Sequence, residues 1–142
     1  KIFNIPGLGF IFRTAKAIPI APARENEALM KKAFDDIAAE LAAGNVVGIF
    51  PEGGLTTDGN ILQFRAGVER VLERTPVPVV PIALRGLWGS IFSRRDGFLR
   101  RARLPRRFRS KIGMVVGEVV PAARASAPVL EAKVRDLRGD WA

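Results

Sequence analysis

The stretch NVVGIFPEGG, residues 45–54, carries the strongest indication of the fold. Its first six residues are uncharged and rich in β-branched side chains, which is typical of a strand buried in a parallel sheet. Pro51 cannot continue a strand ladder, and the two glycines after Glu52 allow backbone to come close to a ligand. We therefore predict a buried strand over residues 45–50 and a loop over residues 51–60, with Glu52 at the rim of a sheet.

Helices and strands alternate on both sides of this stretch. Apolar residues recur at helical spacing over residues 26–43, and Gly44 follows them in the position of a helix-ending glycine. The other predicted elements are strands over residues 16–22, 77–84 and 111–120 and helices over residues 66–74 and 128–138. Because such alternation forms βαβ units, we predict an α/β fold with a mainly parallel β-sheet flanked by helices. Ligands bind at the carboxyl ends of the strands in such sheets.

Length and composition limit the classes of protein and of chemistry. The chain has 142 residues, 48% of them hydrophobic, which fits one domain over residues 1–142. No uncharged stretch exceeds 11 residues, whereas a membrane-spanning helix needs roughly 18. Cys and His are both absent, which excludes disulfides, zinc sites of the usual kind and His-based triads within this chain. We expect no metal site, and a general base must be a carboxylate or lie outside the chain.

Three motifs follow one another along the first 82 residues. The first is Gly7-Leu8-Gly9-Phe10-Ile11-Phe12-Arg13, of the form G-x-x-F-I-x-R. The second is Phe50-Pro51-Glu52-Gly53, continued by Thr56-Thr57, and the third is the proline-interrupted run Val77-Pro78-Val79-Val80-Pro81-Ile82. In this order they resemble the glycerophospholipid acyltransferase family, which includes the 1-acylglycerol-3-phosphate and other lysophospholipid acyltransferases.

The resemblance implies a glycerol-3-phosphate acyltransferase-like fold and an activity. A fatty acyl group would pass from acyl-CoA or acyl carrier protein, as co-substrate and without a bound cofactor, to the free hydroxyl of a lysophospholipid. The family's base is the His of an H-x-x-x-x-D motif. Since this chain holds no His, we expect that motif ahead of Lys1, and we expect this piece to be inactive by itself.

The resemblance also assigns substrate-binding residues. Arg13 would hold a substrate phosphate, for which a planar guanidinium is suited. Glu52 and Gly53 would hold the glycerol backbone near the base and so lower the entropic part of the barrier. Thr56 and Thr57 complete the predicted substrate-binding set.

Two positions depart from the family's pattern. Phe12 stands where the family often has Asp, and Gly54-Leu55 stand where it often has Thr-Arg. Loss of that arginine removes one phosphate ligand, so a strict preference for lysophosphatidate is not expected. The run over residues 50–59 is similar to acyltransferase domains that act on lysophosphatidylethanolamine, and both acceptors stay open.

The net charge of +9 is concentrated in residues 94–111, called the basic segment below. It holds nine Lys or Arg and a single acid, Asp96, a net charge of +8. Cations mixed with apolar side chains suit the headgroup region of an anionic bilayer, which predicts peripheral attachment to the cytoplasmic face of a membrane. The same residues suit an acidic acyl carrier protein or the phosphates of coenzyme A. The predicted contact residues are Trp88, Phe92, Arg94, Arg95, Arg100, Arg101, Arg106 and Arg107.

Other functions also agree with the basic segment. It suits a non-catalytic module that binds an anionic membrane or nucleic acid, since arginines with interleaved aromatic side chains also bind phosphate backbones. It also suits a solvated loop that keeps the protein soluble. A nucleic-acid module leaves Phe50-Pro51-Glu52-Gly53 and the prolines of residues 77–82 unexplained, so acyl transfer is the preferred hypothesis.

Overall fold

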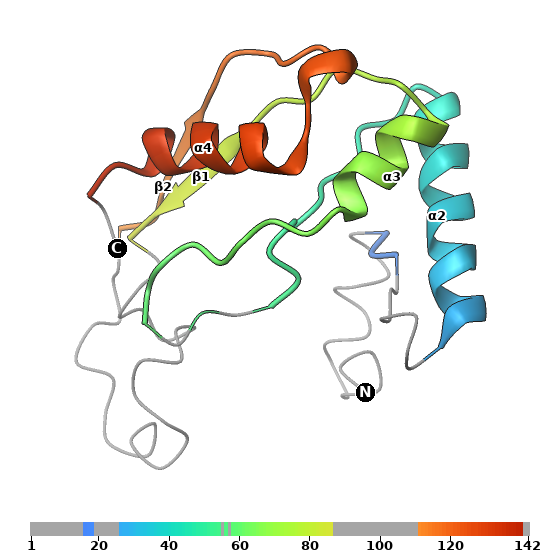
Figure 1. Cartoon of the computed structure of the whole chain (residues 1–142), viewed down its shortest axis with the longest axis horizontal. Helices are drawn as coiled ribbons and strands as arrows, with labels where there is room; N and C mark the ends of the chain where they lie inside the picture. The colour runs from blue at the N-terminus through green and yellow to red at the C-terminus, as the bar shows by residue number, and fades with distance from the viewer. Residues whose placement is uncertain (1–15, 19–25, 55, 57, 87–110, 141–142) are drawn as a thin grey trace. The chain divides into compact units, whose positions relative to one another are not determined.

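The structure, a computed structural model, describes residues 16–18, 26–54, 56, 58–86 and 111–140. The chain divides into two compact units, Lys1–Val47 and Gly48–Ala142. The described elements in chain order are α2 (Glu27–Ala42), α3 (Gly67–Arg74), β1 (Ile82–Arg85), β2 (Gly113–Val116), the short 3₁₀ helix η2 (Ala122–Arg124) and α4 (Ala127–Arg138) (Figure 1). None of the described helices is both long enough and apolar enough to cross a bilayer.

The first unit contains α2, Glu27–Ala42, and local hydrogen bonds define both of its ends. The Asn26 side chain accepts a hydrogen bond from the Leu29 N–H at 2.8 Å, as an N-cap residue does. After the C-cap, Gly44 has a φ of +79° and its N–H bonds to Leu41 at 3.1 Å, while the Asn45 N–H bonds to Glu40 at 3.0 Å. These two bonds form a Schellman motif. The predicted helix and its terminating glycine are confirmed.

The second unit contains an antiparallel pair of strands, β1 (Ile82–Arg85) and β2 (Gly113–Val116). An isolated bridge between Val79 and Val120 extends the pairing, with N–H···O distances of 2.8 and 2.7 Å. The strands predicted over residues 77–84 and 111–120 therefore exist in shortened form, because prolines in the first run lack the N–H that a continuous ladder needs. The α/β class is found, but the predicted parallel sheet is not confirmed, since this described sheet is antiparallel.

The prediction of a buried strand over residues 45–50 is wrong. These residues form no strand, and the Val46 and Phe50 side chains are 98% and 83% exposed. A β-branched run becomes a strand only where a neighbouring strand accepts its backbone hydrogen bonds, and no described strand pairs with it. Of the strand predicted over residues 16–22, residues 16–18 are described and form no strand, and the others lie outside the described residues.

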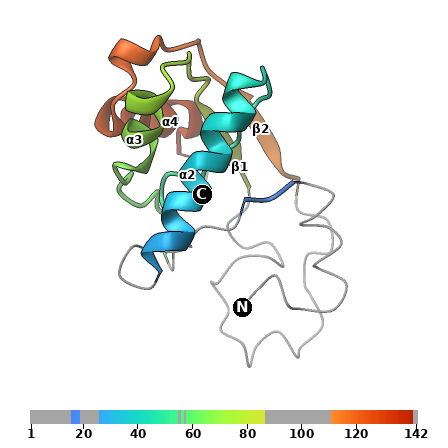
Figure 2. The ribbon, with the colours of Figure 1, turned by 90° about the vertical axis from the view of Figure 1, so that its right-hand side faces the viewer.

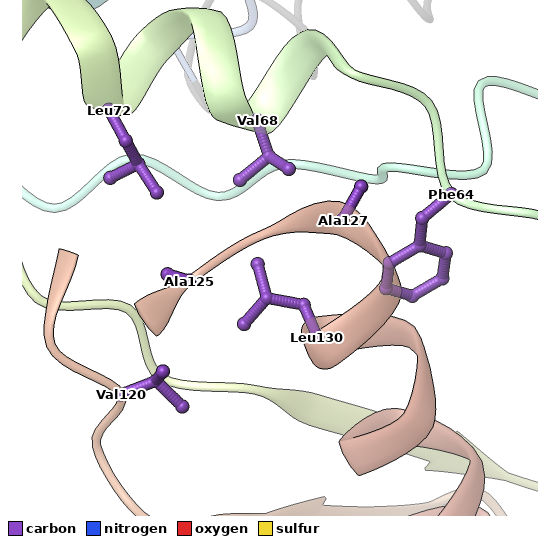
Figure 3. Packing of buried hydrophobic residues seen from close by; sticks show 7 residues of the cluster. All are labelled: Phe64, Val68, Leu72, Val120, Ala125, Ala127 and Leu130. Atoms are coloured by element: carbon purple, nitrogen blue, oxygen red, sulfur yellow. The ribbon is translucent and has the colours of Figure 1, made fainter. Parts of the chain in front are cut away.

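The core of the second unit joins α3 (Gly67–Arg74), η2 (Ala122–Arg124) and α4 (Ala127–Arg138). Figure 3 shows the α3 side chains of Val68 and Leu72 directed toward Leu130 of α4. The remaining buried members of this cluster are Phe64, Val120, Ala125 and Ala127. The helices predicted over residues 66–74 and 128–138 are thus confirmed, and burial of their apolar side chains stabilises the unit.

Helix α4 connects this core to the strands. It packs against β1 and β2, beside which it lies in Figure 1, and α3 lies near the start of α4 in that view and in the view turned by 90° (Figure 2). The Ala127 N–H donates to the Glu69 carboxylate of α3 at 2.8 Å, which supplies α4 with a cap from another helix. Helix α4 is therefore the element to which the other parts of this unit attach.

Candidate functional site

The motif Phe50-Pro51-Glu52-Gly53 forms a tight turn at the start of the predicted loop. The Gly53 N–H donates to the Phe50 carbonyl at 3.2 Å, with Pro51 in the second position of the turn, where its fixed φ is favoured. Gly53 has a φ of +62°, which favours glycine. Because Pro51 also accepts a hydrogen bond from the Arg65 N–H at 2.9 Å, the turn is tied to the chain just before α3.

The Glu52 carboxylate is held by a backbone donor. Its Oε2 accepts a hydrogen bond from the Leu62 N–H at 2.7 Å, ten residues along the chain. The side chain is half-buried. A carboxylate with one oxygen engaged in this way has a fixed orientation and retains acceptor capacity on its other oxygen. This geometry suits a group that orients a hydroxyl-bearing ligand.

Arg65 is a neighbour of this turn that the sequence analysis did not single out. A Cβ atom built on Gly53 would lie 2.9 Å from Nε and 3.0 Å from Cδ of Arg65. The Arg65 side chain therefore lies against the backbone of Gly53, and it would have to move if residue 53 carried a Cβ atom. One arginine ahead of a helix carries no local signal in the sequence, and only the bond between its N–H and Pro51 reveals its position.

The Thr56 hydroxyl is engaged within the loop. It donates to Asp58 Oδ1 at 2.5 Å, and the Asn60 side chain and N–H both donate to the same carboxylate at 2.9 Å. Hydrogen bonds from Thr56 and then from Asn60 lower the pKa of Asp58 to about 2. Thr56 thus contributes to the shape of the loop. Its predicted contact with substrate stays a prediction.

The loop is anchored on α4 through three side chains. Arg138 Nη1 donates to the Gly59 carbonyl at 2.7 Å, and Arg135 Nη2 donates to the Ile61 carbonyl at 2.8 Å. The Phe64 N–H donates to Glu131 Oε2 at 2.9 Å. This bond, and after it the bond from Arg135, lowers the pKa of the Glu131 carboxyl.

An open hollow of about 450 Å³ lies where the loop meets α4. Its charged groups are Glu131 and Arg135, which form an ion pair at 2.9 Å, so these two charges neutralise each other. Among the described residues, no group of three acidic, His or Cys side chains is arranged to hold a metal ion.

The structure brings some of the predicted site residues together and leaves others undescribed. Glu52 and Gly53 share one turn, with Thr56 in the loop that follows. Arg13, Thr57 and the eight predicted contact residues from Trp88 to Arg107 lie outside the described residues. The site that the structure describes is therefore the Glu52–Gly53 turn with Arg65 beside it.

Comparison with known proteins identifies the family. Residues 1–85 match the acyltransferase family, and this match covers more than half of the 142 residues. The chain belongs to the acyltransferase family, and the protein is therefore an O-acyltransferase-like enzyme. The match includes the Glu52–Gly53 turn and Arg65, and it ends before the basic segment and α4. No solved structure gives a significant match to the chain.

Proposed function

We propose that the protein transfers a fatty acyl group from an acyl thioester to the free hydroxyl of a lysophospholipid, in phospholipid biosynthesis or remodelling. The observation that carries the proposal is the Phe50-Pro51-Glu52-Gly53 turn, which lies within the family match and holds the Glu52 carboxylate at 2.7 Å from a backbone donor. An oriented carboxylate beside uncovered glycine backbone suits a polar acceptor that carries hydroxyl groups.

In this reaction the hydroxyl oxygen of the acceptor attacks the carbonyl carbon of the thioester. The new ester C–O bond forms, the C–S bond breaks, and the hydroxyl proton passes by way of a general base to the departing thiolate. The base is the His of an H-x-x-x-x-D motif that lies outside this chain, which has no His. Glu52 and Gly53 hold the glycerol part of the acceptor beside that base.

Two arginines serve the phosphate of the acceptor. Arg13 has this role by the resemblance of its motif, and Arg65 has it because its guanidinium lies beside the Gly53 backbone. A guanidinium offers several donors in a plane and binds phosphate through paired hydrogen bonds. With Gly54-Leu55 in place of Thr-Arg, the site accepts lysophosphatidylethanolamine as well as lysophosphatidate.

The test uses the full-length protein with acyl-CoA or acyl-loaded carrier protein as donor and each of the two lysophospholipids as acceptor. Glu52→Ala is expected to lower kcat/KM about a hundredfold, because a mispositioned acceptor loses much of the advantage of proximity. Glu73→Ala, which removes an exposed acid of α3, is the matched control. Turnover of Glu52→Ala equal to that of the control would remove Glu52 from the site.

The basic segment attaches the protein to the cytoplasmic face of an anionic membrane. Each cation near such a surface contributes about 1 kcal/mol, so a net charge of +8 is sufficient for peripheral binding. Changing Arg100, Arg101, Arg106 and Arg107 to Gln is expected to weaken co-sedimentation with phosphatidylserine vesicles, and salt is expected to weaken binding of the unaltered protein. Equal binding to phosphatidylcholine vesicles contradicts this electrostatic attachment, and competition by acyl carrier protein identifies that carrier as the partner instead.

A further inference from the structure

The peptide group between Ile61 and Leu62 connects α4 to Glu52. Its carbonyl accepts a hydrogen bond from Arg135 Nη2 at 2.8 Å, and its N–H donates to Glu52 Oε2 at 2.7 Å. Both bonds belong to one rigid planar unit, so the guanidinium contributes to the position of the N–H that donates to Glu52. A cation at the carbonyl also polarises the amide and strengthens its N–H as a donor.

Arg135 is itself held in place. Its Nε and Nη2 lie 3.0 and 2.9 Å from Glu131 Oε1, one helical turn earlier on α4. The other oxygen of Glu131 accepts the Phe64 N–H at 2.9 Å. The Glu131–Arg135 pair therefore binds the chain on both sides of Leu62, with the Glu131 side chain half-buried and that of Arg135 exposed.

We propose that Arg135 is a positioning residue for acyl transfer, which orients the Glu52 carboxylate toward the lysophospholipid through the Ile61–Leu62 peptide. The inference rests on the proposed function of Glu52. It adds a residue that lies 50 positions beyond the end of the family match at Arg85. Arg135 contacts no substrate in this role, since its effect passes through the peptide to Glu52.

Arg138 provides a matched comparison on the same helix. It too donates to a loop carbonyl, that of Gly59, at 2.7 Å. The N–H of that peptide belongs to Asn60 and donates to Asp58 at 2.9 Å. Arg135→Met and Arg138→Met thus each remove one bond between helix and loop, but only the first acts on the donor that binds Glu52.

The experiment measures steady-state kinetics of the full-length protein with acyl-CoA and lysophosphatidylethanolamine. Arg135→Met is expected to raise the KM for the lysophospholipid roughly tenfold, as for loss of one hydrogen bond to a charged group, with kcat changed less and the KM for acyl-CoA unchanged. Arg138→Met is expected to change the KM for the lysophospholipid far less, and Arg135→Lys to restore part of the loss. A purely structural role for Arg135 would lower the amount of active enzyme and leave both KM values as they were.

A double-mutant cycle tests the route through Glu52. In a Glu52→Ala background, Arg135→Met is expected to raise the acceptor KM no further, because the group that it positions is already gone. Amide hydrogen exchange gives a second readout that does not depend on activity: Arg135→Met should accelerate exchange at Leu62 much more than Arg138→Met does.

Three outcomes overturn the proposal. The first is an equal rise in acceptor KM for Arg135→Met and Arg138→Met, which indicates general loosening of the loop. The second is an undiminished effect of Arg135→Met in the Glu52→Ala background. The third is an unaltered KM for the lysophospholipid in Arg135→Met while Glu52→Ala impairs transfer. This result contradicts the positioning role and leaves the proposed function intact. If Glu52→Ala itself has no effect, Glu52 is removed from the site and the positioning role of Arg135 falls with it, while acyl transfer by the protein is still tested by turnover of the unaltered enzyme.

Discussion

Short-range hydrogen bonds define the ends of helix α2, whereas long-range hydrogen bonds hold the loop over residues 51–64. Every bond that defines the ends of α2 joins residues three to five positions apart. The Glu52 carboxylate bonds to Leu62 ten residues away, and the bonds from the loop to α4 span 67, 74 and 79 residues. The ends of α2 are thus held by contacts within the helix itself, whereas the shape of this loop depends on contacts with α4.

The difference has a consequence for stability and for function. A bond between distant residues is made only after the entropic cost of closing the intervening chain has been met. The shape of the loop over residues 51–64 is therefore coupled to the packing of α4, while the ends of α2 are held by bonds of their own. The four predictions below test this contrast.

The largest effect is expected for Leu130→Ala in α4. Leu130 is 4% exposed and packs in the cluster with Val68 and Leu72, so its truncation should cost about 2–5 kcal/mol in the free energy of unfolding. Amide exchange should accelerate at Leu62 and Phe64 more than at Asn45, the amide that closes α2. Val129→Ala, next to it and 41% exposed, is the control, and an equal loss in both variants would contradict this packing.

Gly44 and Gly53 both have a positive φ. Comparing their alanine variants distinguishes the cost of local backbone strain from the cost of a tertiary contact. Gly44→Ala after α2 meets no atom within 4 Å and should cost about 1 kcal/mol for its left-handed φ alone. Gly53→Ala meets the same strain and in addition approaches Nε of the exposed Arg65 side chain at 2.9 Å, so it should cost more, about 1–2 kcal/mol, by the amount needed to displace that side chain. Urea denaturation of the two variants measures the difference. Equal costs would mean that Arg65 moves away from the turn freely.

The N-cap of α2 should show a smaller and strictly local effect. Asn26→Ala removes the acceptor of the Leu29 N–H and should destabilise the helix by about 1 kcal/mol. Asn26→Asp, which keeps an acceptor oxygen, should retain most of the stability. The Leu29 amide should exchange faster in the alanine variant while Leu62 does not change. Acceleration at both amides would show that α2 is not a local element.

The smallest effect concerns the pH dependence of the exposed Asp58 turn. Its folded pKa is about 2, below the ordinary value of 3.8, because Thr56 and Asn60 donate hydrogen bonds to the carboxylate. The folded state thus binds the proton less readily, so the contribution of this group to stability is complete above about pH 4 and is lost as the pH falls toward 2. An NMR titration of the carboxyl carbon measures this pKa. Thr56→Val should raise it, and a titration near 3.8 in the unaltered protein would argue against the turn.

Sequence analysis succeeded where short-range chemistry decides the structure. The helical spacing from Met30 to Leu41, followed by Gly44, predicted α2 to within a residue at each end. Pro51 and Gly53 predicted a loop that carries Glu52, and the structure has a turn at the start of that loop. The predicted place of Glu52 at the rim of a sheet is wrong, because residues 45–50 form no strand. The family motifs were also sufficient to indicate acyl transfer, which the match over residues 1–85 confirms at the level of the acyltransferase family.

Sequence analysis failed where the structure of a segment depends on a partner that is distant in the chain. The β-branched residues 45–50 satisfy the pattern of a buried strand, but they form none, and Phe50 is exposed. Strands over residues 77–84 and 111–120 were recognised, yet their hydrophobic patterns carry no information on direction, and the observed pairing is antiparallel. The hydrophobic pattern indicates which residues tolerate an extended backbone. The neighbouring strand determines whether a strand forms and in which direction it pairs.

By itself, the sequence determined the limits of α2, the turn that carries Glu52 and membership of the acyltransferase family. Only the tertiary structure decided that Arg65 lies beside Gly53 and that Arg135 reaches the peptide that binds Glu52. The physical reason is the separation along the chain. Capping and turn formation depend on neighbours within about five residues, whereas the contact between a guanidinium and a carbonyl 74 residues away depends on how α4 packs in the folded unit.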